Sequence, residues 1–173
     1  MQYTSAQAAK LLKRLNEEIS LEENLEQASA AFVAAVTEDV EELRPAYDFA
    51  ATQEHLNELE EKVRRVKHAL NIFNSTTKVE GFDITIDEAL VLIPQLSAKK
   101  QKLAQMRNAL PRTREKAGYG SGASSIINYV YANYDIAAAK AEYERVTEQL
   151  SALQTALDVT NNSKTMEIDV SLT

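Results

Sequence analysis

The sequence contains no cysteine. Without thiols the chain cannot form a disulfide, a thiolate zinc site or an iron–sulfur cluster, and it has no cysteine nucleophile. The absence of cysteine fits a reducing compartment. The first thirteen residues also lack a charged segment followed by an apolar core, so we expect no signal peptide and a cytoplasmic protein.

Long apolar stretches and chain-breaking residues are scarce as well. The longest strongly apolar run is Ala89–Ile93, which is too short to span a bilayer, so we expect no membrane partner. Only four glycines and three prolines occur among 173 residues, so little of the chain has the composition of a linker. A chain of this length can bury its own core. We therefore predict a single domain over residues 1–173.

What the sequence does contain is helical periodicity. We predict helices over residues 4–29, 48–74, 86–116 and 136–161. In the second and fourth, apolar residues recur at alternating spacings of three and four, which is the repeat of a coiled-coil seam. The seams are Phe49, Thr52, Leu56, Leu59, Val63, Val66, Leu70 and Phe73, and Ile136, Ala139, Tyr143, Val146, Leu150, Leu153 and Leu157. These segments predict long antiparallel helices packed as a bundle.

The third helical segment has a comparable seam with one polar member. It consists of Ala89, Leu92, Leu96, Lys99, Leu103, Met106 and Leu110. Lys99 needs an acceptor or an exit to solvent, and a contact between subunits is one source of an acceptor. Pro94 lies inside this segment and predicts a kink, because proline cannot donate a backbone hydrogen bond.

The connections between the helices have strand-forming patterns. We predict a hairpin over residues 75–84, a flexible Gly/Ser-rich loop over 117–125, and strands over 126–134 and 165–171. Residues 30–36 fit either a continued helix or a buried strand, and we favour extended structure. The predicted fold class is therefore mainly α (α+β), with a small β element formed by the connections.

Charge is distributed unevenly along the chain. The net charge is −7, yet residues 95–116 contain seven basic side chains and one acidic one. Basic side chains beside tyrosines 119, 129, 131 and 134 are one pattern of single-stranded nucleic-acid binding. The other interpretation, which we favour, is pairing of this segment with the acidic first segment of this or another subunit. The candidate nucleic-acid contacts are Lys99, Lys100, Lys102, Arg107, Arg112, Arg114 and Lys116.

Catalytic patterns are few. The only histidines are His55 and His68, both off the apolar seam of the second helix. His55 and Glu58 are weak candidates for a metal site, because they supply two ligands at most, and we favour a solvated helix face. No phosphate loop or nucleophile elbow occurs. We predict no catalytic residue and no cofactor.

Several short motifs carry a family resemblance. They are Arg44–Phe49, Asn71–Asn74, Thr85–Leu90, Ile93–Leu96, Asn133–Ile136 and Gln154–Asp158. Together they resemble uncharacterised bacterial proteins labelled septicolysin-like, over about residues 5–170. The sequence departs from the pattern at Asn161 and Asn162, where such chains often have Asn-Trp. The resemblance implies a bacterial source and a mainly helical fold, with no activity, cofactor or catalytic residue to carry over.

Three functions compete on these observations. Long seams with little catalytic chemistry favour a non-enzymatic self-assembling or protein-interaction module that forms a homo-oligomer. The alternative is a nucleic-acid-associated protein that uses residues 99–116. The third is a metal-dependent hydrolase with a site between helices, near His55.

Overall fold

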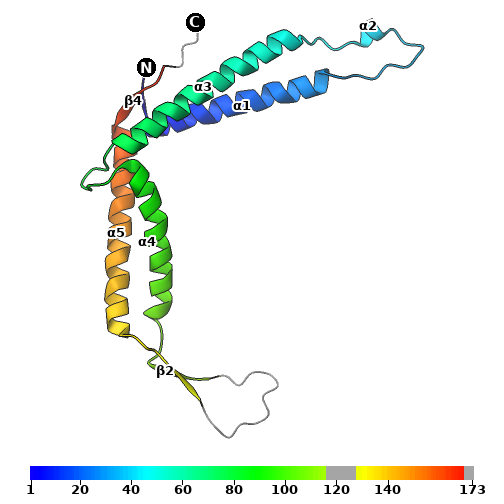
Figure 1. Ribbon diagram of the computed structural model, residues 1–173. Coiled ribbons are helices and arrows are strands. Elements are labelled where there is room, and N and C mark those ends of the chain that lie inside the picture. Colours follow the sequence, from blue (N-terminus) through cyan, green and yellow to red (C-terminus); the bar gives the residue numbers. More distant parts are fainter. Residues whose placement is uncertain (116–127, 170–173) are drawn as a thin grey trace, which may run out of the picture. The chain divides into compact units, whose positions relative to one another are not determined.

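The computed structural model describes residues 1–115 and 128–169. This part of the chain contains five helices and four short strands. Figure 1 draws the course of the chain through them. The predicted mainly α class with a small β component is therefore confirmed. No helix in the described ranges is long and apolar enough to cross a membrane.

The chain forms two compact units where the sequence predicted one domain. The first unit comprises residues 1–77 and 159–173, and the second comprises residues 78–158. The helix α5, Ile136–Ser163, has residues in both units. Periodic seams predict that helices pack, but they do not specify which seams pack together, and for that reason the division could not be anticipated.

The first unit is built on two helices, α1 (Ser5–Ser29) and α3 (Phe49–Thr76), which lie side by side in Figure 1. Thr4 begins α1 with a capping box that it shares with Gln7, which satisfies two free amides at the helix start. The side chains buried in these helices are Ala8, Leu11 and Leu15 of α1 and Leu59, Val63, Val66 and Phe73 of α3. The predicted seam of the second helix is thus buried from Leu59 onward, except at Leu70, which is half-buried.

Two strands lie at the ends of the chain within the first unit. Strand β1, Gln2–Thr4, pairs antiparallel with β4, Thr165–Glu167, and Tyr3 lies opposite Met166. The strand predicted over 165–171 therefore begins where expected and ends at Glu167. Residues 170–171 lie outside the described part of the chain. No local sequence pattern predicts β1, because its partner strand is far away along the chain.

A connection over residues 30–48 joins α1 to α3. Residues 30–36 belong to neither a helix nor a strand, so neither the continued helix nor the buried strand that this stretch fitted is present. The short helix α2, Val40–Leu43, follows, with Asp39 as its N-cap. Asp48 caps α3 by accepting a hydrogen bond from the amide of Ala51 at 3.1 Å.

The second unit pairs α4, Ile86–Met106, with α5, and the two run side by side in Figure 1. Thr85 and Glu88 form the predicted capping box at the start of α4, and the helix continues through Pro94. The apolar seams are largely buried: Ala89, Leu96 and Leu103 of α4 and Ala139, Val146, Leu150, Leu153 and Leu157 of α5 are all shielded from solvent.

Two predicted elements of this unit need correction. The helix expected over 86–116 ends at Met106, and Arg112–Arg114 instead forms strand β2, which pairs antiparallel with β3, Tyr129–Tyr131. Pro111 cannot extend a helix ladder, and the strand partner lies beyond residue 127. The strand predicted over 126–134 is thus confined to β3 among the described residues. The loop predicted over 117–125 lies outside them.

The hairpin predicted over 75–84 is shorter than expected and starts after residue 76. Helix α3 extends to Thr76, and the only pairing described here is an isolated bridge between Lys78 and Thr85. The amide of Val79 donates to the carbonyl oxygen of Ile84 at 3.0 Å, and the amide of Phe82 donates to the carbonyl oxygen of Val79 at 3.0 Å, which closes a tight turn. Gly81 has a φ of +78°, a conformation that glycine adopts without strain.

Candidate functional site

The basic segment is spread over two kinds of structure in the second unit. Lys99, Lys100 and Lys102 lie on α4, Arg107 caps its end, and Arg112 and Arg114 lie on β2. Lys116 lies outside the described residues. The sequence predicted these side chains as one group, and the structure shows that their surroundings differ.

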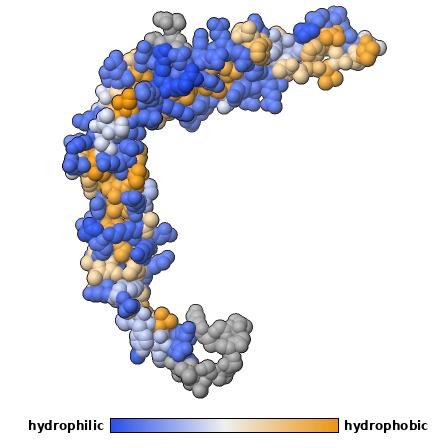
Figure 2. Space-filling view, in the orientation of Figure 1, coloured by the Kyte–Doolittle hydropathy of each residue, from blue (hydrophilic) through white to orange (hydrophobic). Residues whose placement is uncertain are grey.

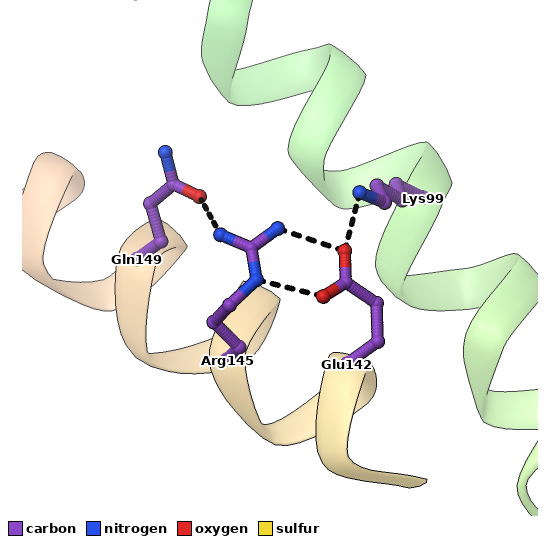
Figure 3. A network of polar contacts seen from close by, with 4 residues as sticks. All are labelled: Lys99, Glu142, Arg145 and Gln149. Carbon is purple, nitrogen blue, oxygen red and sulfur yellow. Dashed lines mark hydrogen bonds and ion pairs between the residues drawn. The ribbon is translucent and has the colours of Figure 1, made fainter. Parts of the chain in front are cut away.

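Lys99 is neutralised within the chain. Its Nζ lies 2.6 Å from Oε1 of Glu142 on α5, and Arg145 donates two hydrogen bonds of 2.7 Å to the same carboxylate (Figure 3). Gln149 accepts a longer bond from Arg145 at 3.4 Å. The hydrogen bond from Arg145, followed by that from Lys99, lowers the pKa of Glu142 to about 2. Lys99 therefore holds α4 against α5, and its acceptor is intramolecular.

Arg107 and Lys100 share an aromatic partner on α5. The guanidinium of Arg107 lies 3.7 Å from the ring centroid of Tyr143, and the ammonium of Lys100 lies 6.0 Å from it. Both distances fall within the range of a cation–π interaction. Nε of Arg107 is buried with no hydrogen-bond partner among the described residues. Tyr143 was predicted only as a seam residue, and its spacing gave no signal of this second role.

The end of the basic segment forms one strand of the β2–β3 ribbon. Arg112 lies opposite Tyr131, Thr113 opposite Val130, and Arg114 opposite Tyr129. All six residues of the ribbon are exposed. The guanidinium of Arg112 lies 5.3 Å from the ring centroid of Tyr129. Tyr134, which follows the ribbon, donates a hydrogen bond of 3.0 Å to the carbonyl oxygen of Met106.

The described residues contain no ion pair from Lys100, Lys102, Arg107, Arg112 or Arg114 to an acidic side chain. The acidic residues of the first segment have partners of their own, as in Lys13–Glu17 and Arg44–Glu41. Pairing of the basic segment with the acidic first segment of this or another subunit, the interpretation that we favoured, stays a prediction. These five cations remain available to an anionic ligand.

Charge is also segregated along the α1–α3 pair. Residues 17–61, which we call the acidic half, contain fourteen acidic and one basic side chain. Residues 1–16 and 62–77, the basic half, contain seven basic side chains and no acidic one. The acidic part of α1 lies beside the acidic part of α3, because Nε2 of His55 on α3 is 4.0 Å from Oε1 of Glu18 on α1. This segregation of charge can be seen in the sequence once the pairing of α1 with α3 is known.

Large apolar side chains are exposed at the end of the first unit where α1 leads into α2 and α3. Val33 and Val36 are 94% and 105% exposed, and Phe49 is 65% exposed although it begins the predicted seam. Figure 2 shows hydrophobic residues gathered over this region. We call this surface the apolar end and define it by Leu21, Leu25, Val33, Val36, Val40, Leu43 and Phe49.

A polar contact connects α1 to the segment before α3. The hydroxyl of Tyr47 donates to Oε1 of Glu26 at 2.6 Å, and Nε2 of Gln53 donates to the same oxygen at 2.8 Å. The hydrogen bond to Glu26 is the main cause that raises the pKa of Tyr47 to about 12. This contact fixes the start of α3 beside α1.

The metal-site candidates His55 and Glu58 both lie on α3, and the acidic side chain that the structure places beside His55 is Glu18 of α1. Among residues 1–115 and 128–169 there is no group of three or more histidine, aspartate or glutamate side chains that could hold a metal ion. The geometry gives a metal-dependent hydrolase no support.

Comparison with known proteins supports the fold and gives no information on the function. No protein-family model matches the chain, and no curated protein sequence matches it. A solved structure from Corynebacterium diphtheriae, described as a functionally unknown conserved protein, is similar with a TM-score of 0.56 and 16% identity. The similarity covers 96% of this chain and 100% of that one. At this identity it shows a shared fold, and the septicolysin-like resemblance stays a prediction.

Proposed function

We infer that the protein is a non-enzymatic interaction module that self-associates through its first unit. The observation that carries this proposal is the apolar end, where seven large apolar side chains lie exposed over residues 21–49. Exposed apolar surface of this extent marks contact sites, because leaving it in water is unfavourable.

The extent of the apolar end suits a protein interface. Side chains of this size and exposure present on the order of 500 Å² of apolar surface. A standard interface contributes about 800 Å² from each partner, and somewhat more than half of that is apolar. The apolar end thus has the apolar area that one side of a stable dimer contains.

The charge pattern favours a second copy as the occupant. In a parallel pair the two acidic halves would face each other, with fourteen acidic side chains from each copy. In an antiparallel pair each acidic half lies against a basic half, which is electrostatically favourable. The apolar end then meets residues such as Lys62 and Lys67, whose alkyl stems can cover apolar surface. Two helix pairs joined in this way form a four-helix bundle.

The proposal is tested by exchanging exposed apolar residues for serine. Val33→Ser/Phe49→Ser removes two side chains of the apolar end, and we expect the dissociation constant of the dimer to rise at least tenfold. Val91→Ser/Leu110→Ser is the matched control, since these side chains are also exposed but lie in the second unit. Sedimentation velocity across a concentration series measures both. Equal dissociation constants for the two variants would contradict the proposal.

A further inference from the structure

The β2–β3 ribbon presents two kinds of side chain on its two faces. In an antiparallel pair, residues directly opposite each other share a face, and so do residues two positions apart. The register therefore places Arg112, Arg114, Tyr129 and Tyr131 on one face. Thr113 and Val130 lie on the other. The ribbon has one face of arginine and tyrosine only.

This face is open to solvent. Tyr129 and Tyr131 are 44% and 62% exposed, and their ring centroids are 6.4 Å apart with the planes tilted by 51°. The rings are therefore not stacked flat on each other, and they keep exposed surface. Arg112 and Arg114 are exposed and form no ion pair with a described acidic residue. Residues 116–127 contain no acidic side chain in their sequence that could neutralise them.

The chain before the ribbon has further positive side chains. Arg107 is five positions before Arg112, and Lys100 is seven positions before Arg107, so the two α4 residues lie on one face of the helix about 10 Å apart along its axis. Both approach the ring of Tyr143. In the second unit, cationic side chains therefore lie next to tyrosine rings both in the ribbon and at the α4–α5 contact.

We propose that the Arg/Tyr face of the β2–β3 ribbon, extended by Arg107 and Lys100, binds single-stranded nucleic acid. The guanidinium group of arginine donates paired hydrogen bonds to phosphate oxygens, and exposed tyrosine rings stack on unpaired bases. The strands of the ribbon are three residues long, which is short for reading a duplex groove, whereas a few stacked nucleotides match its size. The aliphatic Val130 is on the opposite face, so the arginines are not flanked by the apolar side chains that a lipid surface would bury.

Binding is measured on the full chain by fluorescence anisotropy with a 5′-labelled dT20 oligonucleotide at several NaCl concentrations. We expect binding that weakens steeply with salt. Arg112→Ala/Arg114→Ala should raise the Kd at least tenfold at low salt and should lower the salt slope by roughly 1.4, the value for two lost phosphate contacts on a single strand. Tyr129→Leu/Tyr131→Leu should also raise the Kd at least tenfold, with the salt slope unchanged.

The control is Lys140→Ala/Lys164→Ala, which removes the same charge from exposed positions outside the ribbon and should leave the Kd within twofold. Arg112→Lys/Arg114→Lys keeps the charge and should bind better than the alanine variant. Circular dichroism confirms that each variant is folded. No binding of dT20 at low salt, or equal loss in the ribbon and control variants, overturns the proposal. So does binding to phosphatidylserine vesicles but not to dT20. Self-association is a separate readout, so either proposal can fail alone.

Discussion

Lys99 of α4 and Glu142 of α5 are ion-paired at 2.6 Å although forty-three positions separate them in the sequence. Lys99 occupies a position that is otherwise apolar in the predicted seam of α4, yet its side chain is 46% exposed, so its ammonium group reaches solvent as well as its partner. Glu142 is that partner and is itself held by Arg145. The ion pair therefore connects α4 to α5 within one chain.

This pair predicts an acid-sensitive contribution to stability. The pKa of Glu142 falls from 4.5 to about 2 in the folded chain, through its hydrogen bonds from Arg145 and then Lys99. A carboxyl with a lowered folded pKa contributes stability that is present above the unfolded value and is lost as the pH falls toward the folded value. Glu142→Gln should therefore lower the Tm at pH 7 and lose this effect near pH 2.

Thermal melts followed by circular dichroism from pH 7 to pH 2 provide the measurement. Glu144→Gln is the control, because Glu144 is an exposed carboxylate on the same helix, and its effect on the Tm should be small at every pH. A deficit for Glu142→Gln that is as large at pH 2 as at pH 7 would show that the contribution of Glu142 is not electrostatic.

The contact between Tyr47 and Glu26 makes a second prediction. The pKa of the Tyr47 phenol is raised to about 12 because its hydroxyl donates to a carboxylate. A raised pKa stabilises the protonated form, so this contribution is complete below pH 10 and is lost as the pH rises toward 12. In an NMR titration of ring-labelled tyrosine, the resonance missing from Tyr47→Phe should titrate near pH 12. A midpoint near 10 would contradict the contact.

The buried seam of the second unit predicts a large mutational effect. Leu153 of α5 is 0% exposed. Leu153→Ala should lower the free energy of unfolding by about 2–5 kcal/mol, because it removes buried methyl groups and leaves a cavity. Leu90→Ala changes the same residue type at a position that is 48% exposed, and should cost roughly 0.5 kcal/mol or less. Urea denaturation measures both, and equal effects would mean that the seam of α5 is not the core.

The sequence predicted the helices well and their grouping poorly. The seams of Leu59–Phe73 and Ala139–Leu157 are buried except at Leu70 and Tyr143, which are half-buried, because local periodicity determines which face of a helix is apolar. The ends of α4 and the pairing of Arg112 with Tyr131 depend on partners distant in the chain, which no local pattern encodes. Phe49 continued a regular seam and is nevertheless exposed, since periodicity does not reveal where the covering helix ends.

The candidate sites were predictable to a similar degree. The basic cluster over residues 99–116 could be found from composition. Composition could not separate Lys99, which is neutralised by Glu142, from Arg112, which forms no ion pair with a described acidic side chain. Whether a cation is neutralised depends on which helix packs against the one that carries it. The apolar end was likewise hidden, because Val33 and Val36 lie in a stretch whose pattern fits a buried strand.

The antiparallel arrangement makes a prediction about distances. The chain has no cysteine, so a spin label can be attached at one introduced site. Asn16 and Gln27 are exposed on α1, and Gln27 lies about 16 Å further along the helix. If the centre of the pair is near Asn16, Asn16→Cys should give a short distance between copies, and Gln27→Cys one about 30 Å longer along the axis. Double electron–electron resonance measures both, and equal short distances would indicate parallel copies.

The most direct test of self-association is the solution mass by size exclusion with light scattering, at 50 mM and 1 M NaCl. The chain has a mass of 19.2 kDa. We predict twice this mass at low salt, and weaker association at high salt because the attraction between acidic and basic halves is screened while the apolar contact remains. A mass of one chain at both salts, at protein concentrations of about 50 µM, would contradict the account.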